Sequence, residues 1–335
     1  MLYSGKDLRK LIIPLIIEQI LAIAVGMADT IMVSAAGEAA VSGVSLVDTV
    51  NILLINVFSA LATGGAVVSG HFLGKKKRED ACKSAWQILL FATLLAFVIS
   101  VIFITAHDPL LRLMFGKIED DVMKASKTYL IITTYSFVAL AIYNSCAALF
   151  RAMNESKVTM WVSLLMNVIN VVGNAICIYG LHMGVAGVAI PTTISRYVAA
   201  VVIFLLMFQT KKEINLCGQI TWKFNGSLIK KILYIAIPNG LENSMFQLGK
   251  ILVMSAVATM GTSAIAANAV TGTIANWNNL PGFAINLAIV SVVSVCVGAG
   301  RYDQARYYTR RLCRDAMIGI CLLYTSPSPR DGATS

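Results

Sequence analysis

The stretch at residues 11–35, LIIPLIIEQILAIAVGMADTIMVSA, decides the fold, because it is long enough to cross a bilayer and carries Glu18 and Asp29. A helix of ~20 apolar residues spans the ~30 Å hydrocarbon core, where an ionisable side chain is costly and is a candidate for function. The spacing of the two carboxylates corresponds to three helical turns plus ~20°, which predicts one shared face and a separation of about 16 Å. We therefore expect this face to point into a helix bundle.

The composition indicates an all-α membrane protein with many spans. Of the 335 residues, 57% are hydrophobic and 13% are charged, and the mean hydropathy is +0.75, whereas soluble proteins average about 25% charged residues. The first apolar segment is too long for the core of a signal peptide, so we expect it to be retained. Transmembrane helices are predicted at 11–35, 44–73, 85–106, 129–150, 158–179, 185–208, 232–258 and 266–297, with the start of a ninth at 316.

The connecting loops differ in charge, which predicts the orientation in the membrane. One set of alternate loops carries 20 Lys and Arg residues, and the other carries only four, which are offset by acidic side chains. Because loops rich in Lys and Arg stay in the cytoplasm, the N-terminus is predicted to be cytoplasmic, in a plasma membrane of bacterial type. The net charge of +10 then reflects membrane topology and does not indicate nucleic-acid binding.

The chain repeats itself at an offset of 224 residues without a gap. This offset carries Pro14 to Pro238, Glu18 to Glu242 and Gly74 to Gly298, among other pairs. Six predicted spans separate the copies, so both copies start on the same side of the membrane. Such parallel repeats are typical of transporters whose two halves rock around a central site.

The repeat divides the chain into two helical lobes and a tail. A lobe of six helices is predicted at 1–215, and a partial second lobe of about three helices at 216–323. The residues at 324–335, YTSPSPRDGATS from Tyr324, are polar and stop the ninth span early. We interpret this tail as foreign to the fold, from a truncated or chimeric reading frame, with a natural short paralogue as the alternative.

The chain resembles the multidrug and toxic compound extrusion (MATE) family over roughly residues 6–320. The resemblance rests on the helix from Pro14 to Asp29, on GKKKREDA echoed as GAGRYDQA, on GVAGVAIPTTISR at 184–196 and on IPNGLENSMFQLGK at 237–250. It implies twelve helices in two six-helix lobes around a V-shaped cleft that opens alternately to the two sides. It also implies export of cationic or amphipathic compounds in exchange for protons or sodium ions.

The resemblance implies a cation site in the first lobe. Related members use an Asp fifteen residues after the Pro of the first helix, and Asp29 stands at that spacing from Pro14. They also carry an Asn and, four residues later, an Asp on the fifth helix, where this chain has Asn170 and Asn174. The second carboxylate is therefore missing, which leaves Asp29 as the main ionisable group of the lobe.

Helical periodicity places further polar residues beside this site. Asn170 and Asn174 fall with Asn167 on one helical stripe, within about 60°. With Thr192 and Thr193 they either line a polar cavity or form hydrogen bonds between helices, and the two roles are compatible.

Asp29 is suited to either coupling ion. An apolar environment disfavours the charged carboxylate, so Asp29 could exchange a proton, whereas Na⁺ would require neutral oxygens such as those of Asn170 and Asn174 as well. A structural ion pair or a buried neutral acid is the alternative. The sequence leaves the choice between H⁺ and Na⁺ open.

In the second repeat, Glu242 is the counterpart of Glu18. The acidic residue of the NorM-like branch lies a turn further along this helix, where the chain has Phe246. Glu18 and Glu242 are candidates for cation coupling or substrate binding, and the alternative is a gate or a snorkelling pair near the cytoplasmic lysines. Lys250 is two turns plus ~80° from Glu242, so the two are not expected to pair.

The eighth predicted helix carries residues that suit a cleft or a hinge. Three amides return to within ~20° of one face, at Asn268, Asn279 and Asn286. Pro281 and Gly282 are expected to interrupt the helix, either as a hinge or as a kink needed for packing.

Two other functions are compatible with this composition. A lipid-linked oligosaccharide flippase of the wider superfamily would need a more cationic cleft, whereas the predicted intramembrane charges are mostly acidic. An intramembrane enzyme would need a convergent catalytic set, and none is evident, so a non-enzyme is predicted. No nucleotide-binding motif or metal-ligand spacing occurs, so no cofactor is expected beyond the coupling ion. The expected partners are small cationic or amphipathic molecules and membrane lipid, and the chain is expected to act as a monomer.

Overall fold

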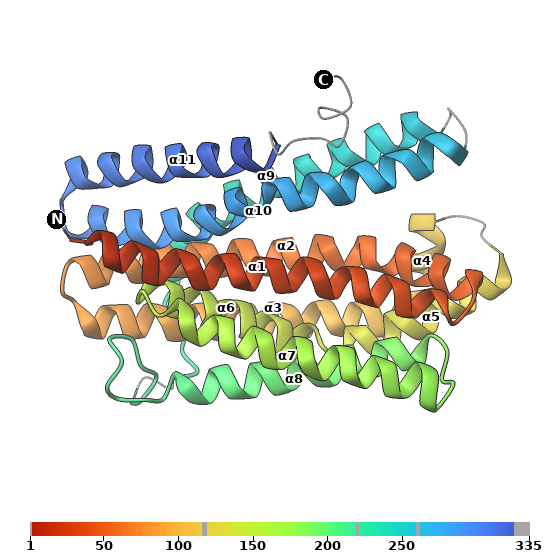
Figure 1. Ribbon diagram of the computed structural model, residues 1–335. Helices are drawn as coiled ribbons and strands as arrows, with labels where there is room; N and C mark the ends of the chain where they lie inside the picture. Colours follow the sequence, from red (N-terminus) through yellow and green to blue (C-terminus); the bar gives the residue numbers. More distant parts are fainter. Residues whose placement is uncertain (1, 116–118, 219–220, 259–261, 325–335) are drawn as a thin grey trace, which may run out of the picture.

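The computed structural model describes residues 2–115, 119–218, 221–258 and 262–324, which fold into helices that run roughly parallel or antiparallel to one another (Figure 1). The side chains of residues 251, 254, 255, 257, 258, 262–270 and 273 lie outside this description. The helices are α1 (Gly5–Ser34), α2 (Glu38–Gly74), α3 (Arg78–Thr105), α4 (His107–Phe115), α5 (Asp120–Thr134), α6 (Phe137–Ala152), α7 (Ser156–Ala175) with the π-helical turn η1 (Ile176–Gly180), α8 (Ala186–Leu206), α9 (Gly226–Ala258), α10 (Thr262–Gly298) and α11 (Tyr302–Tyr324).

The predicted fold class is confirmed, and several predicted spans coincide with helices that can cross a membrane. Among the described residues, six helices are long and apolar enough to do so, or seven if α5 and α6 count as one broken span. The first helix begins at a capping box, in which the backbone N–H of Asp7 donates to Ser4 Oγ and the N–H of Ser4 donates to the Asp7 carboxylate.

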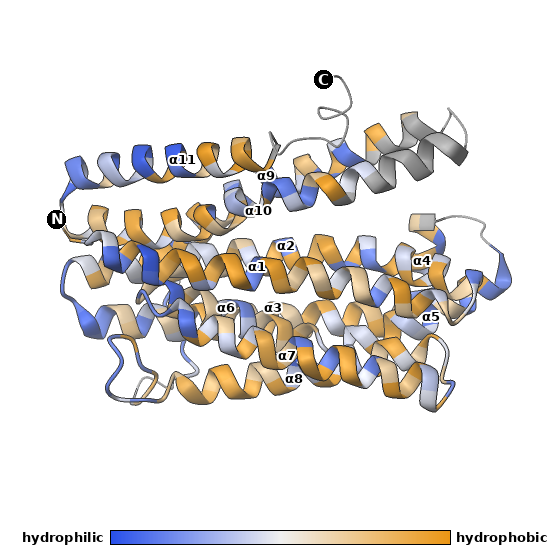
Figure 2. Ribbon diagram, in the orientation of Figure 1, coloured by the Kyte–Doolittle hydropathy of each residue, from blue (hydrophilic) through white to orange (hydrophobic). Residues whose placement is uncertain are grey.

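Three local predictions were wrong. The span predicted at 129–150 is two helices, α5 and α6, bent by 50°. A short helix, α4, occupies part of the loop that precedes it. The last helix begins at Tyr302 and not at residue 316, because residues 301–314 continue the helix with a charged face; Figure 2 shows its first half mostly hydrophilic and its second half hydrophobic. Of the predicted tail, only Tyr324 is described.

The helix ends follow the sequence repeat. Helix α2 begins at Glu38 and ends at Gly74, and α10 begins at Thr262 and ends at Gly298, so both ends keep the offset of 224 residues. The starts of α3 and α11 and the ends of α1 and α9 keep it too. The repeat is therefore a repeat of structure, and α9–α11 correspond to α1–α3.

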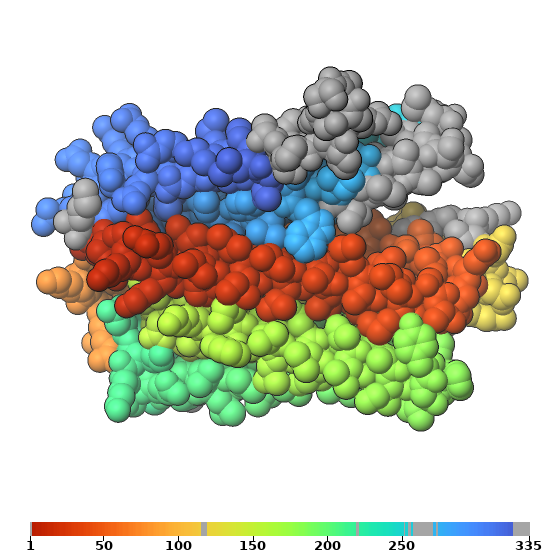
Figure 3. Space-filling model, viewed as in Figure 1, coloured from red at the N-terminus to blue at the C-terminus, as the bar shows by residue number. Residues whose placement is uncertain are grey.

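Helix α2 is the hub of the packing. It contacts α3, α5 and α6 on one side and α9 and α10 on the other. Helix α1 packs against α7 and α10, and Figure 3 shows it running between α7 and α8 below and α10 and α11 above. A buried apolar cluster joins α1 to α10, formed by Leu8, Leu11, Leu15, Ala284, Ala288 and Val292.

The two repeats touch near the ends that carry the basic loops. Gly64 of α2 lies against the backbone of Ile232, and Ala60 lies 3.4 Å from the position of a Cβ on Gly240 of α9. Further along α9, Phe246 and Leu252 are exposed. The lobes are therefore closed at the end predicted to be cytoplasmic.

A close crossing of α2 and α10 marks this closed end. A Cβ on Gly298 would collide with the backbone of His71, and a Cβ on Gly74 would collide with the backbone of Val295. One turn earlier, Gly70 faces Ser294, which is its own counterpart in the repeat. Because counterparts meet each other here, a local two-fold axis passes through the crossing.

Candidate functional site

Four predicted residues of the first lobe lie together. Asn174 on α7 donates from Nδ2 to Asp29 Oδ1 on α1 over 2.8 Å and, at 3.4 Å, to Asn170 Oδ1. Asn170 Nδ2 in turn donates to Thr192 Oγ1 on α8 over 2.9 Å. A chain of hydrogen bonds thus joins α1, α7 and α8 through the predicted polar stripe. Thr193, in contrast, donates to the backbone oxygen of Ile132.

Asp29 borders a cavity of about 120 Å³ between α1, α2, α5 and α8. A second carboxylate, Asp48 of α2, lines the same cavity. Asp48 Oδ1 accepts hydrogen bonds from Tyr129 Oη over 3.1 Å and from Asn51 Nδ2 over 3.3 Å. The cavity therefore has two acidic groups, although the family position at Asn174 carries an amide.

Sequence reasoning missed Asp48. The signal was present, because Asp48 is an ionisable residue inside the predicted span 44–73, the same criterion that identified Asp29. What the sequence did not show is that α2 turns this residue toward α1.

Two buried amide oxygens beside the carboxylates lack a hydrogen-bond partner. Within the described residues, Asn174 Oδ1 and Asn51 Oδ1 are both unsatisfied. Buried polar atoms are normally paired, so such exceptions call for an explanation. Two carboxylates and two free amide oxygens form the oxygen-rich donor set that a hard cation requires.

Arg196 of α8 lies near this cavity. Its Nη1 donates to Ser136 Oγ over 2.8 Å, a partner that the sequence did not identify. Its positive charge is close enough to act on both Asp29 and Asp48. The arginine therefore offsets part of the negative charge of the two carboxylates without capping either of them in the ion pairs of the described residues.

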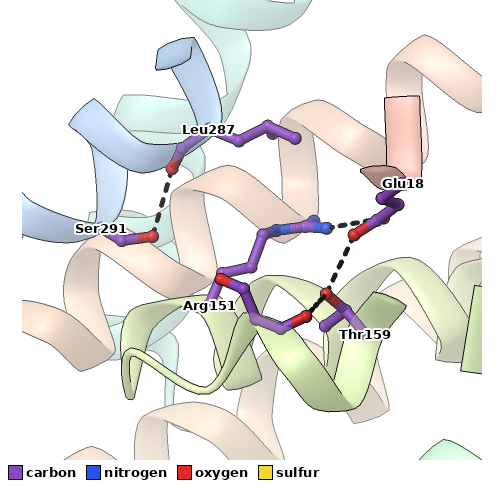
Figure 4. A network of polar contacts seen from close by, with 6 residues as sticks. Glu18, Arg151, Thr159, Leu287 and Ser291 are labelled. Carbon is purple, nitrogen blue, oxygen red and sulfur yellow. Dashed lines mark hydrogen bonds and ion pairs between the residues drawn. The ribbon is translucent and has the colours of Figure 1, made fainter. Parts of the chain in front are cut away.

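Glu18 lies in a different place, at the junction of α1, α6 and α7 (Figure 4). Its Oε1 is 3.4 Å from Arg151 Nη1, and its Oε2 accepts a hydrogen bond from Thr159 Oγ1 over 2.9 Å. Both charged side chains are largely buried, with 11% and 13% exposure for Glu18 and Arg151. The two predicted carboxylates of α1 thus share the face toward α7, but only Asp29 borders the small cavity. Burial also excludes the predicted snorkelling role for Glu18.

The predicted residues of the second lobe do not converge on a cavity in the described part of the chain. Glu242 and Lys250 are both exposed, and Lys250 Nζ lies 4.9 Å from the ring centroid of Phe246. Asn279 and Asn286 are exposed as well. The side chain of Asn268 lies outside the described residues.

The predicted interruption at Pro281 and Gly282 was wrong. Helix α10 continues through both residues from Thr262 to Gly298. Pro281 instead packs against α11, since a Cβ on Gly319 would lie 3.0 Å from its ring. A proline within a helix bends it without ending it where neighbouring helices support the backbone.

Comparison with known proteins places this architecture. The MatE family model matches residues 14–176 and 238–324. The "Uncharacterized transporter YisQ" of Bacillus subtilis is 28% identical over 297 residues, which cover 87% of this chain and 64% of that protein. The "Probable multidrug resistance protein NorM" of Thermotoga maritima is 25% identical over 333 residues, which cover 97% of this chain and 71% of that protein. The chain thus spans less than two thirds of the length of the first of these relatives.

Solved structures share the fold. A structure described as an outward-facing conformation of a multidrug resistance MATE family transporter superposes with a TM-score of 0.86 at 21% identity, over 94% of this chain and 69% of that one. A MOP superfamily transporter from Pyrococcus furiosus superposes with a TM-score of 0.84 at 21% identity, over the same shares. Since the family model covers most of the sequence and the helices follow this fold, the chain belongs to the MATE family of membrane transporters.

Proposed function

We propose that the chain forms the first lobe and part of the second lobe of a secondary antiporter. It would export cationic or amphipathic compounds in exchange for H⁺ or Na⁺ across a bacterial-type plasma membrane, with its N-terminus in the cytoplasm. The observation that carries the proposal is the Asp29 cavity, where two carboxylates and two unsatisfied amide oxygens face one another. The relatives named as multidrug resistance proteins support the substrate class.

The cavity explains how a cation could be coupled to movement. Asp29 and Asp48 repel each other when both are charged, and a bound Na⁺ or proton relieves that repulsion. A cation would also compete with the Asn174 amide for Asp29, which changes the bond between α1 and α7. Because α1 also packs against α10 of the second repeat, a shift of α1 would be felt at the contact between the lobes.

The charged residues that line this cavity are both acidic. A flippase for pyrophosphate-linked lipids would be expected to present cations there. The export function is therefore the better supported of the two.

Replacement of Asp29 by Asn is expected to abolish gradient-driven export of ethidium by the full-length transporter encoded at the source locus. The substitution keeps the size of the side chain but removes the charge that holds the cation. Efflux is measured in drug-sensitive cells and in proteoliposomes with imposed proton or sodium gradients, and the gradient that drives efflux identifies the ion. The control is Asp120→Asn, which makes the same chemical change at an exposed position. Export by Asp29→Asn at the rate of the control would refute coupling through Asp29.

Replacement of Asp48 by Asn is expected to weaken coupling without abolishing it. One carboxylate remains in the cavity, so the concentration of coupling ion needed for half-maximal efflux should rise roughly tenfold, which corresponds to ~1.4 kcal/mol. The measurement is a titration of efflux against Na⁺ at fixed pH and against pH without Na⁺. An unchanged half-maximal concentration would remove Asp48 from the site.

A further inference from the structure

A second cavity of about 570 Å³ lies between the end of α2 and the start of α9. The two helices belong to different repeats, so the cavity bridges the lobes. It adjoins the crossing of α2 and α10, because His71 lines it and the backbone of His71 also contacts Gly298. The proposed cation site does not use any residue of this cavity.

Three lysines line the cavity, and no carboxylate does. Lys75 comes from the end of α2, and Lys230 and Lys231 come from the first turns of α9. None of the three forms an ion pair with a described acidic residue. Three like charges that share a cavity repel one another, so an anion bound among them would be stabilised by all three.

The opposite wall of the cavity is apolar. It is formed by Val68 and Phe72 of α2 and by Ile235 and Tyr234 of α9. Tyr234 is 82% exposed, as suits an amphipathic ring at a membrane surface. A small free anion would contact the lysines and leave this wall unused, whereas an amphiphile with an anionic head would use both.

We propose that this cavity binds the headgroup of an acidic phospholipid from the leaflet next to the basic loops. Basic pockets between helices on the cytoplasmic side are suited to anionic headgroups. The phosphate lies among Lys75, Lys230 and Lys231, and the start of the acyl chains lies along Phe72 and Tyr234. Because its ligands come from both repeats, the lipid favours the arrangement in which the lobes are closed at this end.

The test measures lipid retained by the purified 335-residue chain. The protein is reconstituted into vesicles of phosphatidylcholine alone or of phosphatidylcholine with phosphatidylglycerol, extracted, and analysed by native mass spectrometry. Wild type is expected to keep one phosphatidylglycerol more tightly than phosphatidylcholine. Equal retention of the two lipids would overturn the proposal without reference to any variant.

The pocket variant replaces Lys75, Lys230 and Lys231 by Gln. Each lysine near an anionic surface contributes about a fivefold change in affinity, so the triple variant is expected to bind phosphatidylglycerol about a hundredfold more weakly. All three side chains are exposed, so folding should be retained, and circular dichroism checks this.

The matched control removes three other exposed lysines from the same end of the molecule, Lys6, Lys10 and Lys157. It is expected to keep the bound lipid. An equal loss in the control would show a general charge effect and overturn the site. A third arm adds inorganic phosphate to the lipid-bound wild type; displacement of the lipid at millimolar phosphate would show that the cavity is a free-phosphate site instead.

Discussion

Replacement of Arg151 by Met is expected to lower the free energy of unfolding by about 3 to 5 kcal/mol, the range found when one partner of a buried ion pair is removed. The loss arises because Glu18 stays buried, at 8% exposure, while its counter-ion is gone. Thr159 still donates one hydrogen bond to Glu18, but a single hydroxyl does not balance a buried negative charge. Unfolding is followed by denaturant titration in mixed micelles.

A double variant separates the lost ion pair from lost packing. Glu18→Gln combined with Arg151→Met leaves no unpaired charge, so most of the stability should return, since a buried pair replaced as a unit is often nearly neutral. The control is Arg112→Met, at an exposed position on α4. If Arg151→Met were no less stable than Arg112→Met, the buried pair would not contribute to the fold.

Replacement of Gly298 by Ala is the second large effect that we expect. The added Cβ would collide with the backbone of His71, and backbone cannot move aside as the end of a flexible side chain can. Overpacking of this kind costs about 1 to 3 kcal/mol, and the contact with backbone favours the upper end. The structure relieves the collision by separating α2 from α10, so the closed end of the lobes should open.

The opening is measured by the distance between spin labels at Lys76 and Arg301, two exposed positions that flank the crossing. Gly298→Ala is expected to lengthen that distance and to lower stability, and Gly74→Ala should do the same through Val295. The control is Gly249→Ala on α9, where a Cβ would meet open space. There alanine is expected to be neutral or to stabilise by up to ~1 kcal/mol through its higher helix propensity. Identical behaviour of Gly298→Ala and Gly249→Ala would contradict a tight crossing.

The two carboxylates of the small cavity differ in how far the sequence identifies them. The length of the first apolar segment and the spacing from Pro14 are local properties, and both point to Asp29. The amide partners on α7 follow from helical periodicity, which places Asn170 and Asn174 on one face. The contribution of Asp48 does not follow, because it depends on how α2 is rotated against α1.

The sequence by itself determined the class of fold, most spans and the repeat. Helix length and hydrophobicity reflect the thickness of the bilayer, and the offset of 224 residues recurs in the ends of α2 and α10 because each copy encodes the same helices. Only the tertiary structure decided which distant side chains meet: Glu18 with Arg151, Asp29 with Asp48 in one cavity, and Gly74 with Gly298 at the crossing. The reason is physical, because the sequence of a helix sets its length and its faces, whereas its rotation and contacts are set by close packing against its neighbours.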